Sequence, residues 1–260
     1  MPRPLLHSLL SLILNQLTRV LHAVCSVYKQ NFLAMNSNSS NGTHSDDKEE
    51  CSVRPILCEL GVITRPDGSA ILTQGHTVVM SAVYGPSEVR MQRLQVDRAY
   101  VETVFRPKAG VPNTSDRLRE TIIRDTCETA MIATLYPRTT ISVILQEMED
   151  SGGLLACSIN ASCLALMDSG VSMKFLFAAV TCGVTEDDLI IVDPDADKLK
   201  ECKASLTFAF DSINKNVIAS YTSGTFPVQT YNNGLEKCRQ ASDFLFDFYR
   251  DIVRKYASTL

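Results

Sequence analysis

The chain has 260 residues, of which 45% are hydrophobic and 21% are charged, so a wholly disordered or a fibrous protein is excluded. Its 25 basic and 29 acidic side chains give a net charge of −4, which excludes a generally basic nucleic-acid coat protein. The charge is unevenly distributed: residues 54–138 carry 11 basic against 9 acidic side chains, whereas residues 139–260 carry 10 against 16. We therefore expect any polyanion to bind the first half of the folded part.

The first fifty residues differ in composition from the rest of the chain. Residues 1–34 combine a basic start with a short apolar run, a pattern typical of a secretory signal or an amphipathic presequence. Residues 36–50 are polar and cannot bury enough apolar surface to fold. We favour Met35 as the functional start, residues 1–50 as a disordered or upstream extension, and residues 51–260 as one folded domain.

The nine cysteines and four histidines show no metal-ligand spacing. No Cys-x-x-Cys pair occurs, so we expect neither a structural metal nor another cofactor. Cys127, Cys157 and Cys163 lie in apolar periodic segments, where a thiol behaves as a small hydrophobic group. Buried, reduced thiols are therefore expected rather than a disulfide framework.

The first half of the folded part is predicted to contain four strands and a helix. Segment 56–86 is predicted to form three strands, separated by a Pro-Asp-Gly turn and by a single glycine. A fourth strand is expected at 101–105. Ser115 is predicted to cap a helix that Pro137 stops. Its apolar face would consist of Leu118, Ile122, Cys127, Met131 and Leu135.

The second half is predicted to place a helix of small residues at the centre of the fold. A β-branched strand at 139–145 precedes a helix at 153–169, whose small side chains allow close packing against a sheet. Gly170 is expected to end this helix in the left-handed conformation. Further strands are predicted at 174–183, 188–192, 205–211 and 216–221, followed by a terminal amphipathic helix. This order predicts a single α+β domain.

Two charged segments are candidates for binding. Residues 90–124 hold eight cationic against four acidic side chains, and arginine suits bidentate contact with RNA phosphates. A solvated, salt-bridged surface explains the same composition, and Tyr100 and Phe105 are too few for an aromatic stacking platform. The acidic segment 193–197 could bind Mg²⁺, although an exposed acidic turn is the simpler explanation.

Several motifs together resemble the RNase PH family, and within it a eukaryotic exosome ring subunit. They are Arg65-Pro-Asp-Gly68, Gly75-His-Thr77, Tyr84-Gly-Pro86, Ile122-Ile-Arg-Asp-Thr-Cys-Glu128, Tyr136-Pro-Arg-Thr139 and Asp150-Ser-Gly-Gly153. The resemblance covers about residues 52–257 and implies an RNase PH-like α+β fold (ribosomal protein S5 domain 2-like), a mixed sheet with packed helices. It also implies a ring of RNase PH-like subunits with cap proteins, RNA in the channel, and an associated 3′→5′ nuclease. We expect no membrane partner, and localisation to the nucleus, nucleolus and cytoplasm.

The same resemblance implies that catalytic groups are missing. Active family members split RNA with phosphate, which needs cations that hold phosphate and two carboxylates about six residues apart. The positions expected to be vestigial are Thr114 and Ser115 for phosphate, and Asp197 (or Asp195) and Ala204 (or Lys203) for the carboxylates. We therefore predict a non-catalytic subunit that supports rRNA maturation and mRNA turnover by assembly and RNA channelling.

Cations along the first half are the predicted RNA contacts. Arginines shortly after Tyr-Gly-Pro line the channel neck in relatives, which implies this role for Arg90 and Arg93. The full predicted set is Arg90, Arg93, Arg106, Lys108 and Arg117. One alternative is an active nuclease, with residual phosphorolysis or metal-dependent DNA cleavage, that uses Lys108 and Asp193, Asp195 or Asp197. Another is a secreted protein, which predicts a glycan on Asn38 or Asn41.

Overall fold

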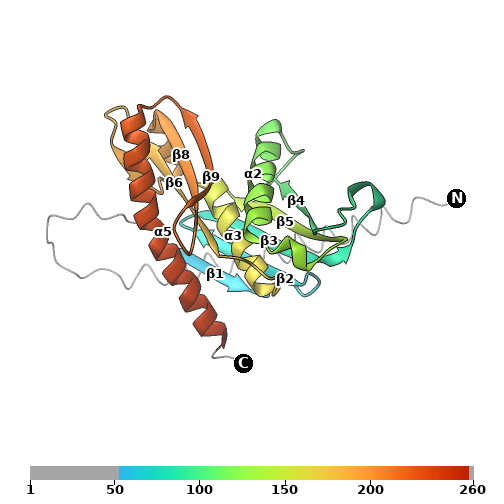
Figure 1. The fold of residues 1–260 in the computed structure, drawn as a ribbon. Helices are drawn as coiled ribbons and strands as arrows, with labels where there is room; N and C mark the ends of the chain where they lie inside the picture. Colours follow the sequence, from blue (N-terminus) through green and yellow to red (C-terminus); the bar gives the residue numbers. More distant parts are fainter. Residues whose placement is uncertain (1–52, 258–260) are drawn as a thin grey trace. The chain divides into compact units, whose positions relative to one another are not determined.

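Two β-sheets enclose one central helix in the computed structural model, which describes residues 53–257 (Figure 1). The five-stranded sheet has the order β1-β2-β3-β5-β4, with β1 (Ile56–Leu60), β2 (Gly68–Gln74), β3 (Thr77–Glu88), β4 (Tyr100–Arg106) and β5 (Thr139–Glu149). The four-stranded sheet has the order β7-β6-β8-β9, with β6 (Phe177–Val184), β7 (Ile190–Val192), β8 (Ala204–Asp211) and β9 (Val217–Gly224). The helices are α2 (Thr114–Ala130), α3 (Leu154–Asp168), α4 (Ala196–Glu201) and α5 (Val228–Ala257). The predicted α+β class is confirmed.

The three-strand start is confirmed as an antiparallel meander of β1, β2 and β3. The Pro-Asp-Gly turn is fixed by the Asp67 carboxylate, which accepts the Gly85 N–H at 2.8 Å. β3 continues beyond the expected end at Gly85, because a bulge lets pairing with β5 resume at Ser87. β4 lies parallel to β5, and α2 provides the crossover between them.

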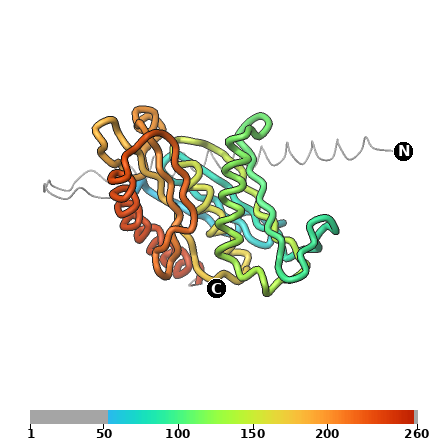
Figure 2. Tube along the Cα trace, turned by 45° about the horizontal axis from the view of Figure 1, so that its top comes forward, coloured from blue at the N-terminus to red at the C-terminus, as the bar shows by residue number. Residues whose placement is uncertain are grey.

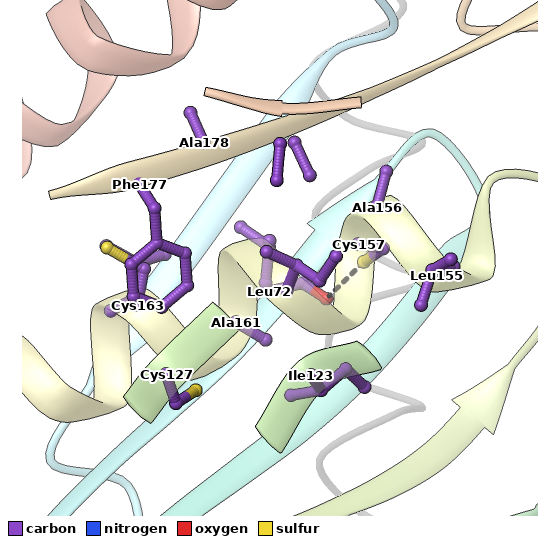
Figure 3. Close-up of a cluster of buried hydrophobic side chains, with 14 of the residues drawn as sticks. Leu72, Ile123, Cys127, Leu155, Ala156, Cys157, Ala161, Cys163, Phe177 and Ala178 are labelled. Carbon is purple, nitrogen blue, oxygen red and sulfur yellow. Dashed lines mark hydrogen bonds between the residues drawn. The ribbon is translucent and has the colours of Figure 1, made fainter. Parts of the chain in front are cut away.

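Helix α3 is central, as its small residues predicted. Thirteen of its fifteen residues are buried, and it packs on β2 and β3 on one side and on β6 on the other. Figure 3 shows Cys157 and Ala161 of this helix among larger apolar side chains from α2, β2 and β6. The Asn160 amide joins α3 to β6, since it accepts the Ala179 N–H at 2.7 Å and donates to the Ala179 carbonyl at 2.9 Å.

The prediction for α2 was wrong at both ends. The helix begins one residue before Ser115 and is capped through Asn113, whose N–H donates to Asp116 at 2.9 Å. It ends at Ala130 rather than near Pro137, because Met131 pairs with Met173 in an isolated bridge and takes an extended conformation. Its buried residues are Asp116, Ile123, Thr126, Cys127 and Ala130, so Leu118 and Leu135 are exposed instead of packed.

The remaining predicted elements are present with shifted bounds. β6 begins three residues later than expected, and β7 is only three residues long. The acidic segment 193–197 was predicted as a loop, but its second half opens the short helix α4. α5 packs the expected face, including Cys238, Leu245 and Tyr249, onto the core.

The seven described cysteines are all free thiols. Burial raises the pKa of Cys127 and Cys163 to about 12, so both stay protonated at physiological pH. Within residues 53–257, no helix has the length and hydropathy needed to cross a membrane. Met35, the sequons at Asn38 and Asn41, and the proposed extension lie outside the described residues.

Candidate functional site

A cavity of about 530 Å³ opens between the start of α2, the start of α3 and the four-stranded sheet. Hydroxyl groups line much of it: Ser115 from α2, Thr181 from β6, Ser205 and Thr207 from β8, and Tyr221 from β9. Gly152, Gly153 and Leu154 line the cavity where α3 begins. A helix N-terminus and several hydroxyls are suitable donors for an anion.

The charged side chains that line this cavity are Arg119, Asp150 and Lys200. The Arg119 guanidinium is held by Asp116 at 2.7 Å and lies 6.0 Å from the centre of the Phe105 ring. Lys200 pairs with Asp197 at 3.1 Å in a solvent-exposed contact. Asp150 accepts the Gly152 N–H at 3.0 Å, so it shapes the turn that precedes α3.

Arg54 binds the acidic segment to the start of α3. Its guanidinium donates to Asp193 at 2.7 Å and to Asp195 at 3.1 Å, and to the carbonyls of Ser151 and Gly152 at 3.0 Å each. Burial opposes the charge of Arg54, but the hydrogen bond and charge of Asp193 outweigh this effect and raise its pKa. The guanidinium is therefore a fixed cation that ties together two loops of the cavity wall.

Asp193 has no free oxygen for chemistry. Its side chain is fully buried, and its second oxygen accepts the Arg54 backbone N–H at 3.0 Å and the Gln74 amide at 2.8 Å. The residue six positions later is Leu199, an apolar side chain that lines the cavity. In the described part of the chain, no group of three or more Cys, His, Asp or Glu side chains is arranged to hold a metal ion.

The positions predicted to be vestigial lie around the cavity but do not form a catalytic set. Thr114 and Ser115 open α2, and only Ser115 lines the cavity. Asp197 points into solvent, with 95% of its side chain exposed. Ala204 is buried at the start of β8, and neighbouring Lys203 pairs with Asp188 at 3.1 Å. The structure therefore brings no two of these groups together as a carboxylate pair.

The predicted RNA contacts fall into two groups rather than one. Arg90 and Arg93 lie in the segment between β3 and β4, whereas Arg106, Lys108 and Arg117 lie between the end of β4 and the first turn of α2. β4 separates the two groups by about 20 Å, given the rise of a seven-residue strand. Figure 2 shows the β3–β4 segment projecting from one end of the sheet, away from the turn before α2.

Ion pairs reduce the free positive charge of residues 90–124. Four arginines have acidic partners: Arg93 with Glu102, Arg98 with Glu128, Arg119 with Asp116, and Arg124 with Asp125. Arg90, Arg106, Lys108 and Arg117 are exposed, and no carboxylate of residues 53–257 lies within 4 Å of their charged groups. Half of the cations counted in the sequence thus remain available to a polyanion.

Sequence reasoning missed two parts of the site. No sequence motif singled out Arg54, and none placed Lys200 or Tyr221 in a cavity. Arg54 is followed by Pro55 and a strand. This local pattern does not indicate the contact of Arg54 with Asp193, which lies 139 positions later in the chain. The hydroxyls of Thr181 and Thr207 lie 3.0 Å apart. The sequence pattern around them indicated only strands and did not place the two residues together.

Two family descriptions match the chain: the 3′ exoribonuclease family, domain 1, over residues 52–172, and domain 2 of the same family over residues 176–240. The chain belongs to the RNase PH family. The RNase PH-like fold that the sequence motifs implied is therefore confirmed, with the two matched regions corresponding to the two sheets.

Relatives within the RNase PH family include exosome proteins. The chain is 32% identical to the exosome complex exonuclease RRP46 homologue of Arabidopsis thaliana, over 82% of this chain and 96% of the relative. The crystal structure of rice (Oryza sativa) Rrp46 aligns with a TM-score of 0.76 and 32% identity, covering 80% of this chain and 98% of that one. The Archaeoglobus fulgidus exosome with RNA bound to its active site shares the fold, with a TM-score of 0.67 and 19% identity over 76% of this chain and 89% of that one.

Proposed function

We propose that this chain is a ring subunit of an RNA exosome that guides RNA without cleaving it. Its relatives over most of the chain are named as exosome components, which supports assembly with other RNase PH-like subunits. The single observation that carries the non-catalytic role is the state of the acidic segment. Asp193 and Asp195 are bound by Arg54, and Asp197 faces solvent beside Lys200.

Phosphorolysis as the family resemblance implies it needs cations that hold the phosphate and two carboxylates beside it. In the cavity, Arg119 is already neutralised by Asp116, and Asp150 is the lining carboxylate. Burial raises the pKa of the nearby Glu147, and the charge of Asp150 raises it further, but Glu147 does not line the cavity. The cavity thus has donors for an anion without the second carboxylate that phosphorolysis requires.

The purified chain is expected to release no nucleoside diphosphates from labelled RNA in the presence of inorganic phosphate. The physical reason is the absence of a free carboxylate pair at the cavity. Product analysis by chromatography checks this, with Mg²⁺ and labelled DNA in parallel for the alternative metal-dependent nuclease. Phosphate-dependent release that is lost in both Asp150→Asn and Asp197→Asn would establish the active-nuclease alternative instead.

RNA guidance is proposed for the exposed cations, with Arg90 at the channel beside Arg93, whose ion pair with Glu102 would be exchanged for a phosphate. Arg90→Glu together with Arg93→Glu is expected to weaken RNA binding by a reconstituted ring about tenfold at low salt, because contacts with phosphate release counterions. The measurement is a filter-binding titration at several salt concentrations. A matched control, Arg250→Glu with Arg254→Glu on the exposed side of α5, makes the same charge change elsewhere. Equal affinities for the two double variants at low salt would remove the channel role.

The further partners follow from the proposed assembly. Cap proteins that bind RNA and a separate 3′→5′ nuclease would act at the two ends of the ring, in the nucleus, nucleolus and cytoplasm. Affinity purification of the tagged chain, with identification of the co-purifying proteins, tests the assembly directly. Recovery of the chain without other RNase PH-like subunits would contradict it.

A further inference from the structure

Four described residues other than glycine have a positive φ angle: Arg138 at 61°, Asp188 at 59°, Asp193 at 49° and Lys215 at 56°. In this left-handed region the Cβ atom crowds the backbone, which costs about 1–2 kcal/mol for an ordinary residue. A glycine would adopt the same conformation without that cost. The cost is smaller for Asp188 and Asp193, whose short polar side chains tolerate this conformation, so Arg138 and Lys215 are the two residues that most call for an explanation other than the turn itself.

Contacts within the chain explain three of these residues. Their charged groups form ion pairs: Asp193 with Arg54 at 2.7 Å, Asp188 with Lys203 at 3.1 Å, and Lys215 with Asp243 at 2.7 Å. Arg138 differs, because its side chain is exposed and forms no ion pair with any residue between 53 and 257. Its guanidinium is therefore free to bind a partner outside the described residues.

Arg138 lies beside the segment that carries Arg90 and Arg93. Its backbone N–H donates to the Gln95 carbonyl at 3.2 Å, and the next residue, Thr139, pairs with Glu88 at the end of β3. The turn before β5 therefore contacts the β3–β4 segment near both of its ends. The Arg138 side chain starts from the same end of the sheet as the two predicted channel arginines.

The chemistry of this end favours single-stranded RNA as the partner. Arg90 is exposed and without a carboxylate within 4 Å in the described part of the chain, and the Arg93 guanidinium lies 5.4 Å from the centre of the Tyr100 ring. Arginines beside an aromatic ring can hold phosphates while a base stacks. Because Glu88, Asp97 and Glu102, the ion-pair partner of Arg93, lie in the same region, the surface is not uniformly positive, and binding would depend on close contacts rather than on a long-range field.

We propose that Arg138 binds a phosphodiester group of single-stranded RNA beside Arg90, as an additional contact of the RNA-guiding surface, and this inference rests on the proposed function. The planar guanidinium presents two parallel N–H groups to two phosphate oxygens. The other three residues of positive φ form their ion pairs within the chain, whereas Arg138 forms its ion pair with the RNA.

The test is Arg138→Gly in a reconstituted ring. Glycine removes the charge and the backbone strain together. The strain of about 1–2 kcal/mol exceeds the cost of about 0.4–1 kcal/mol that glycine adds by making the unfolded chain more flexible. The melting temperature of the variant should therefore be equal to or higher than that of the wild type. RNA affinity should fall about fivefold at low salt, and the slope of log K against log salt should decrease by about 0.7, as for one lost phosphate contact with a single strand. A merely structural role would instead leave the salt slope unchanged.

Lys215→Gly is the matched control, since it also exchanges a cationic residue of positive φ for glycine, in the turn between β8 and β9. We expect it to leave RNA affinity and the salt slope unchanged. If the Arg138→Gly variant binds RNA like the wild type while the Arg90→Glu, Arg93→Glu double variant binds weakly, the role of Arg138 is overturned and the RNA-guiding function stands. Wild-type binding by all three variants would also overturn the RNA-guiding function. Failure of the Arg138→Gly ring to assemble would overturn the inference and assign the side chain to a neighbouring subunit.

Discussion

Arg54→Ala is expected to lower the free energy of unfolding by about 3–5 kcal/mol, because it leaves the buried Asp193 carboxylate without its cation. The side chain of Asp193 is fully buried and that of Arg54 is 13% exposed, so solvent cannot replace the lost partner. The same substitution releases the carbonyls of Ser151 and Gly152 before α3. Urea unfolding of the purified chain, followed by circular dichroism, measures the effect.

A double-mutant cycle separates the ion pair from general damage to the site. Asp193→Asn removes the buried charge and keeps a residue that tolerates positive φ. Arg54→Ala combined with Asp193→Asn should therefore cost less than the sum of the two single changes. Arg254→Ala, which breaks an exposed pair on α5, is the control and should cost less than about 1 kcal/mol. A loss from Arg54→Ala as small as that of the control would contradict the role assigned to Arg54.

Asn160→Ala is expected to cost about 2–4 kcal/mol, because two buried backbone groups of Ala179 lose their partner and neither can reach water. β7 is too short to pair with this part of β6, and the Asn160 amide takes the place of a neighbouring strand. The change should therefore loosen the contact of α3 with the four-stranded sheet. Thermal unfolding and hydrogen exchange at Ala179 measure this effect.

Ser158→Ala is the control for Asn160→Ala. Ser158 is equally buried on α3, but its hydroxyl donates only to the Leu154 carbonyl one turn earlier. Its loss leaves no strand group without a partner and should change stability by less than about 1 kcal/mol. Equal costs for the two variants would show that Asn160 acts by packing rather than by its two hydrogen bonds.

The wall of the cavity depends on both of these interactions. Arg54 holds the loops on either side of the start of α3, and Asn160 joins the same helix to the sheet that forms the floor. A buried polar network of this kind favours one cavity shape, and its bonds are nearly complete: among the described residues only Arg54 Nε and Gln74 Oε1 of the network are buried without a hydrogen-bond partner. Variants at Arg54 should therefore change anion binding in the cavity more strongly than they change RNA binding at the distant segment of Arg90 and Arg93.

The sequence alone determined the family, the order of the elements apart from the short helix α4, and the central position of α3. These features follow from local patterns: turn residues mark the first three strands, and a run of small residues marks a helix that can approach two sheets closely. The sequence also located the candidate contacts Arg90 and Arg93. The family and the role of the two arginines were implied by motifs that resemble the RNase PH family, whereas the other inferences need only residues that are neighbours along the chain.

Tertiary structure alone decided which charged residues are free to act. Asp193 and Arg54 are 139 positions apart, and no local pattern relates them. α2 ends at Ala130, seven residues before the proline that was expected to stop it, because Met131 takes an extended conformation and bridges to Met173 while its N–H still donates to the Cys127 carbonyl. Likewise, only the folded chain distinguishes Arg138, strained and without an ion-pair partner among residues 53–257, from the arginines whose charge is already neutralised. Ion pairing and burial join residues distant in sequence, and for that reason the chemistry of the site was decided by the fold.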